Sequence, residues 1–136
     1  MRAETAFGAA EARYASTHGS VHGHRPYAHA PLLENRALAQ HLHLPALEWD
    51  ELEAVWPEGS AGVALAALRL GQAARASAIL DSLEPLRAAG GGMPTFTVVI
   101  PSEMDTAPSL AGTLWIELVR YELTRSRDQP TLWRPG

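Results

Sequence analysis

The chain has 136 residues, of which 46% are hydrophobic, and this is enough for one domain with a single core. Its formal net charge is -4 and no cluster of Lys or Arg forms a basic stripe, which argues against nucleic acid or an anionic membrane as a partner. Cysteine is absent, so disulfides and thiolate chemistry are excluded. We find no signal-peptide pattern and no apolar run long enough to span a bilayer, and expect a soluble, cytoplasmic protein.

The first third of the sequence predicts a helix followed by a long loop. Alanine is frequent between residues 3 and 17, with Phe7, Ala10 and Tyr14 at helical spacing. Residues 16–31 change in character, because glycine and proline punctuate four histidines, and this predicts a loop. The spacing of these histidines matches no standard zinc site, so we predict no metal: His18, His22, His24 and His29.

The middle of the chain predicts successive helices. Residues 34–44 read as a helix stopped by proline, and residues 45–54 as a second, short helix that proline begins. Residues 60–70 are small or apolar on every side, which is typical of a helix buried among other helices. Gly71 ends this inner helix at a tight turn, and residues 73–86 form an amphipathic outer helix.

The last third predicts one more helix after an irregular segment. Gly90, Gly91 and Gly92 end the outer helix, and the run from Thr95 to Ile100 is strand-like but isolated. Pro108 suits the first turn of a helix that continues to about Thr124. We therefore predict one all-α domain over residues 1–136, with a helix and a His/Gly/Pro-rich loop in 1–33 and inner and outer helical hairpins in 34–136.

Several segments, taken in order from Glu48 to Trp133, resemble a known family. The similarity is to the C-terminal part of six-hairpin, glucoamylase-like (α/α)6 toroid proteins, and it is carried by Trp56-Pro-Glu-Gly-Ser, Leu70-Gly71, Gly91-Gly-Met-Pro-Thr95, Pro108-Ser-Leu-Ala-Gly-Thr-Leu-Trp115 and Pro130-Thr-Leu-Trp133. It implies a toroid of inner and outer helices with a saccharide bound at the mouth formed by the loops before the inner helices. A whole toroid needs roughly twice this length, so we expect a partial toroid.

The resemblance implies a carboxylate site at the start of the inner helix. Glu58 stands at this helix mouth, where the helix dipole favours its ionised form and suits it to act as a general base or nucleophile. Glycoside hydrolysis needs a second carboxyl group, and the candidates are Glu103 and Asp105 on the long loop. The alternatives are structural: Glu58 and Asp105 as helix caps, and Glu103 as a solvated loop charge.

Aromatic and histidine side chains complete the predicted site. The indole of Trp56 can stack on the apolar face of a sugar ring, and His24 and Tyr27 are candidates for contacts with sugar hydroxyls. We predict a glycoside-hydrolase-like domain, active or not, that binds a saccharide without a cofactor. The alternative is a non-catalytic helical module that self-associates, or completes a larger toroid, through inner-helix residues without neighbours, such as Val63, Leu65 and Leu68.

Overall fold

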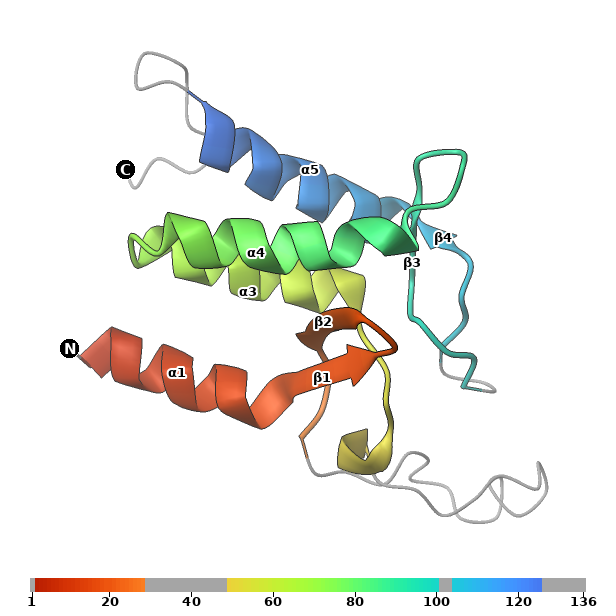
Figure 1. The fold of residues 1–136 in the computed structure, drawn as a ribbon, viewed down its shortest axis with the longest axis horizontal. Coiled ribbons are helices and arrows are strands. Elements are labelled where there is room, and N and C mark those ends of the chain that lie inside the picture. The colour runs from red at the N-terminus through yellow and green to blue at the C-terminus, as the bar shows by residue number, and fades with distance from the viewer. Residues whose placement is uncertain (1, 29–48, 101–103, 126–136) are drawn as a thin grey trace.

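The computed structural model describes residues 2–28, 49–100 and 104–125, shown in colour in Figure 1. Within these ranges the α-helices are α1 (Arg2–Tyr14), α3 (Pro57–Arg69), α4 (Ala73–Leu83) and α5 (Leu110–Thr124). Helices α3 and α4 pack side by side, while α1 and α5 lie on opposite sides of this pair (Figure 1). The expected helices at 3–17, 60–70, 73–86 and 108–124 are therefore present, with ends that differ by a few residues.

The fold is not all-α, so the predicted array of helical hairpins is wrong. Strands β1 (Ala15–His18) and β2 (Val21–His24) form an antiparallel hairpin in the segment expected to be a loop. A second small antiparallel sheet pairs β3 (Met93–Pro94) with β4 (Pro108–Ser109). The described chain is thus a mixed α/β structure, and helices with two small two-stranded sheets stand in place of the partial (α/α)6 toroid.

The β1–β2 hairpin forms because its turn and its buried face both suit this sequence. Gly19 has a φ of 58°, a left-handed conformation that glycine adopts without steric cost. Val21, Gly23 and His24 are buried, since β2 packs against α3 and α4. The sequence of β2 shows no clear alternation of apolar and polar residues, so packing against the helices, rather than a local pattern, makes it a strand.

Helix α3 is the centre of the fold, as its uniformly apolar sequence predicts. The backbone of Trp56 is extended (φ -102°, ψ 100°), and Pro57 is the first residue of the helix. Proline suits this position because the N–H that it lacks would have no partner within the helix. Small buried side chains let α4 and α5 approach closely: Ser60, Ala61, Ala64 and Ala67. Gly71, with a φ of 76°, makes the tight turn into α4.

Helix α4 has two faces, which confirms the predicted amphipathic outer helix. Ala76, Leu80 and Leu83 are buried against the core, and the short 3₁₀ helix η2 (Glu84–Leu86) follows it. Ion pairs from Arg87 and Arg120 to Glu84 of η2, and from Arg87 to Glu117, join this end of α4 to α5. The hydrogen bond from Arg87 lowers the pKa of the Glu84 carboxyl and raises the pKa of Arg87.

The described residues between β3 and β4, 95–100 and 104–107, form hydrogen-bonded loop structure, and the strand-like run Thr95–Ile100 contributes only one isolated bridge. The amide of Phe96 donates to the carbonyl of Asp105 (3.1 Å), and Ile100 pairs with Met104 in an isolated bridge. Ser109 then caps α5 by accepting a hydrogen bond from the amide of Gly112 (3.1 Å). A second buried cluster supports this loop and consists of Trp49, Ala54, Phe96 and Ile100.

The remaining predicted elements precede α3. The helix expected at 34–44 lies outside the described residues, as do residues 45–48 of the one expected at 45–54. Of the latter, Trp49–Glu51 form the 3₁₀ helix η1, and residues 52–56 lead in non-helical conformation to α3. The short helix is therefore reduced, in its described part, to one 3₁₀ turn.

Candidate ligand-binding clefts beside α1

The smaller of two clefts lies between α1 and α3 and has a volume of about 350 Å³. Small residues of α3 form one wall, including Gly62 and Ala66, and an aromatic-rich face of α1 forms the other, with Phe7 and Tyr14. The cleft exists because the side chains on this face of α3 are small and leave space between α3 and α1. Apolar walls with a few polar groups are typical of small-molecule sites.

Trp56 forms one side of this cleft. Its extended backbone, required by the following proline, places the indole over the first turn of α3. A Cβ atom at Gly59 would lie 2.2 Å from Cε3 of Trp56, so only glycine leaves room for the ring. The amide of Trp56 donates to the carbonyl of His24 (2.8 Å), which fixes the backbone beside the cleft.

The larger cleft lies on the other side of α1 and has a volume of about 780 Å³. Its walls come from α1, the β1–β2 hairpin, residues 51–53 and the exposed side of α4. Hydroxyl and carboxylate side chains are more frequent here than in the smaller cleft: Ser16, Thr17, Ser82, Glu11, Glu51 and Glu53. The larger cleft is thus the more polar of the two.

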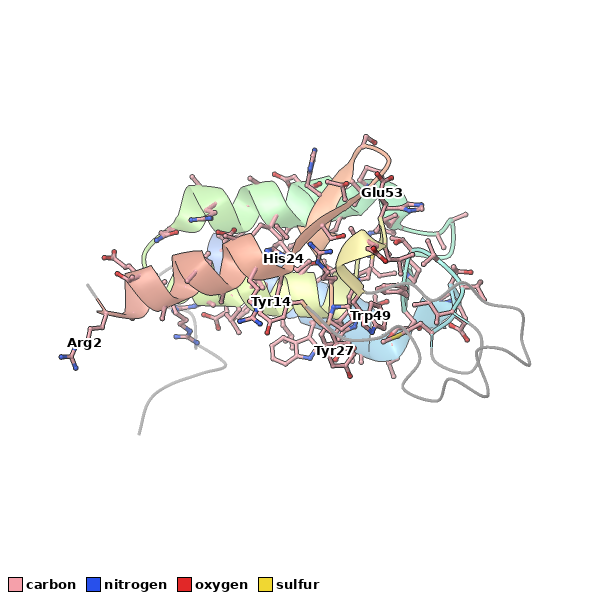
Figure 2. The ribbon with its side chains drawn as sticks, turned by 90° about the horizontal axis from the view of Figure 1, so that it is seen from below. Arg2, Tyr14, His24, Tyr27, Trp49 and Glu53 are labelled. Atoms are coloured by element: carbon pink, nitrogen blue, oxygen red, sulfur yellow. The ribbon has the colours of Figure 1, made fainter. Side chains whose placement is uncertain are left out.

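The two clefts share Glu11, His24 and Arg25 in their walls. The guanidinium of Arg75 forms an ion pair with Glu11 through two nitrogens, and its Nε donates to Oε1 at 2.9 Å. Nε2 of His24 lies 4.0 Å from the same carboxylate oxygen. Figure 2 shows His24 in the middle of the molecule, with Tyr14 on one side and Glu53 on the other.

Burial keeps His24 neutral at neutral pH. Only 5% of the residue is exposed, and this burial lowers its pKa from 6.5 to about 4. Its Nδ1 has no hydrogen-bond partner among the described residues, and neither has the buried Nε of Arg25. The other guanidinium nitrogens of Arg25 donate to the carbonyls of Trp49 (3.2 Å) and Ala15 (2.9 Å).

Ser60 holds the backbone of the site in place. Its hydroxyl accepts a hydrogen bond from the amide of His24 (2.8 Å) and donates one to the carbonyl of Trp56 (2.8 Å). This serine is completely buried. It therefore ties β2 to the start of α3 and fixes the backbone of His24 and Trp56, which both line the smaller cleft.

Two predicted site residues come together here, since Trp56 and His24 both line the smaller cleft. Tyr27 lines neither cleft; its ring is 53% exposed and packs against Trp49, with ring centres 5.4 Å apart (Figure 2). Glu58 also lines neither cleft and lies at the opposite side of the first turn of α3, beside Gly112 of α5.

Asp105, the other predicted acid that the structure describes, lines neither cleft. The carboxylate of Asp105 accepts a hydrogen bond from the amide of Ala107 (3.0 Å), so it holds its own loop rather than the N-terminus of α5. Glu103 lies outside the described residues. The first turn of α3 has no side-chain cap, so the structure does not use Glu58 as the N-cap.

Sequence reasoning missed Glu11, Arg25 and Arg75. Glu11 carried a usable signal, because it lies on the same face of α1 as Phe7 and Tyr14 and so interrupts an apolar stripe with a charge. The sequence gives no comparable signal for Arg75, because its contact with Glu11 joins residues that are 64 positions apart.

No group of three or more metal-ligating side chains is found in the described parts of the chain. None of the described helices is long and apolar enough to cross a membrane. Comparison of the chain with protein-family models, with curated proteins and with solved structures gives no match. The clefts themselves are therefore the basis for any assignment of function.

Proposed function

We propose that the chain is a saccharide-binding domain whose smaller cleft, between α1 and α3, receives a sugar ring. The observation that carries this proposal is that an indole, a carboxylate and an imidazole, those of Trp56, Glu11 and His24, line one cleft. The C–H face of a pyranose packs on an aromatic ring, and its hydroxyl groups need both donors and acceptors. The cleft offers these chemistries together.

Charge favours a neutral ligand over a cation. Arg75 already neutralises Glu11, and His24 is uncharged at neutral pH. A cation in this cleft would lose hydration and meet the guanidinium of Arg25, which donates to the carbonyls of Trp49 and Ala15, whereas a polyol exchanges hydrogen bonds with water for hydrogen bonds with the protein. The proposal concerns binding, because hydrolysis would need a second carboxyl group placed across the sugar from the first.

The test is a calorimetric titration of the whole chain with glucose, mannose, galactose and xylose and with their linear oligomers. We expect at least one of these sugars to bind, and Trp56→Ala to remove that binding. Trp56→Phe, which keeps an aromatic face, should retain part of it. Failure of every sugar to bind would overturn the proposal.

Two carboxamide variants locate the site. Glu11→Gln keeps the shape of the side chain but loses its charge, and we expect it to weaken sugar binding by about tenfold, the equivalent of losing one or two hydrogen bonds. Glu58→Gln should leave binding unchanged, because Glu58 lines neither cleft. The reverse result, a loss in Glu58→Gln alone, would place the site at the helix mouth that the sequence suggests.

The alternative of a self-associating helical module has less support. Leu65 and Leu68, two residues expected to lack neighbours, are partly buried against the main core. Val63 faces the smaller cleft instead. The exposed apolar residues of the described chain lie elsewhere, such as Leu110 and Leu114 on α5.

A further inference from the structure

We propose that the smaller cleft holds a sugar ring between two aromatic side chains, Tyr14 and Trp56, and so selects pyranoses whose hydroxyl groups are all equatorial. This inference rests on the proposed saccharide binding and adds the class of sugar, glucose or xylose rather than galactose or mannose. Its basis is that both aromatic side chains line the same cleft, Tyr14 from α1 and Trp56 from the residue before α3.

Backbone hydrogen bonds hold these two residues on opposite sides of one peptide unit. The carbonyl of His24 accepts from the amide of Trp56 (2.8 Å), and the amide of Arg25 donates to the carbonyl of Tyr14 (2.9 Å). The C=O and N–H of a trans peptide point in opposite directions, so Trp56 and Tyr14 bond to this unit from opposite edges. Their backbones are thus about two strand spacings, roughly 10 Å, apart. One ring fits between them at contact distances of about 3.5–4 Å.

The rest of the cleft wall is also apolar where a ring would lie. Tyr14 and Trp56 are both half-buried, so part of each side chain stays open to the cleft. On α3 the lining residues include Gly62, Val63 and Ala66, whose side chains carry neither a donor nor an acceptor. Both faces of a bound ring would therefore meet aromatic or aliphatic carbon.

The stereochemistry of the sugar decides which rings suit two such walls. In β-glucosides and β-xylosides every hydroxyl group is equatorial, so both ring faces present C–H groups, which pack well on aromatic rings. A β-galactoside has an axial hydroxyl at C4 and a β-mannoside has one at C2, and this makes one ring face polar. An axial hydroxyl in contact with an apolar wall loses its hydrogen bonds with water without replacement, which weakens binding by about tenfold or more.

The test is a calorimetric titration of the whole chain with the methyl β-glycosides of glucose, xylose, galactose and mannose, in which the methyl group fixes the anomeric configuration. We expect Kd for the glucoside and the xyloside to be at least about tenfold lower than for the other two. Tyr14→Ala removes one wall, so it should weaken glucoside binding and reduce the preference to about threefold or less. Tyr14→Phe keeps the aromatic ring and should retain the preference.

Tyr27→Ala is the matched control, because Tyr27 is an exposed tyrosine that lines neither cleft. It should leave all four Kd values unchanged. Equal Kd values for the four glycosides, tighter binding of the galactoside or the mannoside, or a preference that Tyr14→Ala leaves intact would overturn the two aromatic walls while the saccharide site stands. Absence of binding by all of these sugars and their oligomers would instead overturn the proposed function itself.

Discussion

Nε2 of His24 lies 4.0 Å from Oε1 of Glu11, yet the two residues do not form an ion pair at neutral pH. Burial lowers the pKa of His24 to about 4, so the imidazole is neutral there. The carboxylate of Glu11 takes its counter-charge from Arg75 instead. At neutral pH an uncharged imidazole thus lies beside a carboxylate whose negative charge is already balanced by Arg75.

Acid should destabilise the protein through His24. The unfolded chain binds a proton on this residue near pH 6.5 and the folded chain only near pH 4, so lowering the pH between these values favours unfolding. The full effect is about 3 kcal/mol in the free energy of unfolding. Urea denaturation at a series of pH values should show this loss. His24→Gln should flatten the profile, whereas His22→Gln, on an exposed residue, should leave it unchanged; equal profiles for wild type and His24→Gln would contradict the assignment.

Arg75→Ala should loosen α1. The Arg75 guanidinium pairs with Glu11 and lies 5.2 Å from the ring centre of Phe7, so one side chain makes two contacts with a helix that has no fully buried residue. We expect amide hydrogen exchange in α1 to accelerate by about tenfold, which corresponds to a loss of about 1.4 kcal/mol. Arg69→Ala, at the exposed end of α3, should have no such effect. Unchanged exchange in α1 would show that other contacts hold the helix.

Gly59→Ala should displace Trp56. The new methyl group would lie 2.2 Å from the indole, and relief of such overlap costs about 1–3 kcal/mol. Thermal unfolding and the tryptophan emission spectrum would report both effects. Gly62→Ala is the matched control on the same helix, since a Cβ there meets open space, and it should stabilise the protein by up to about 1 kcal/mol. Equal effects of the two variants would contradict the close packing.

Ser60→Ala should destabilise the protein by about 1–3 kcal/mol. The buried hydroxyl pairs with the amide of His24 and the carbonyl of Trp56, and its removal leaves both without this partner. Chemical denaturation measures the loss. Ser77→Ala, whose hydroxyl donates to Asp81 at the surface of α4, should change stability by less than about 0.5 kcal/mol. A loss in Ser60→Ala no larger than this would contradict the bridging role.

Local patterns predict α1, α3, α4 and α5 well, but the short helix expected at 45–54 is wrong in its described part. The small, apolar sequence of α3, the turn at Gly71 and the two-faced pattern of α4 each follow from the periodicity or the conformational needs of single residues. Trp56 and His24 were also predicted as site residues, and both line the smaller cleft. The helical features depend on residues close together in the chain, whereas the meeting of Trp56 with His24 joins two distant segments.

The β1–β2 hairpin and most of the candidate site depend on distant residues, which is why local patterns miss them. A Cβ atom at Gly23 would lie 2.5 Å from Cγ1 of Val55, so β2 needs glycine where it approaches a segment far along the chain. Glu11 becomes part of the site only when Arg75 approaches it. The periodicity of α1 marks Glu11 as a charge within an apolar stripe, but it does not show that Arg75 approaches it.

The tight turn at Gly71 also implies an order of folding. Helices α3 and α4 are neighbours in sequence and in space, so they can associate early as a local helical hairpin. The contacts of α1, such as the pair of Glu11 with Arg75, close much longer loops and should form late. Because α1 is synthesised before α3 and α4, we expect its aromatic face, with Phe7 and Tyr14, to stay exposed to water until α3 has been made.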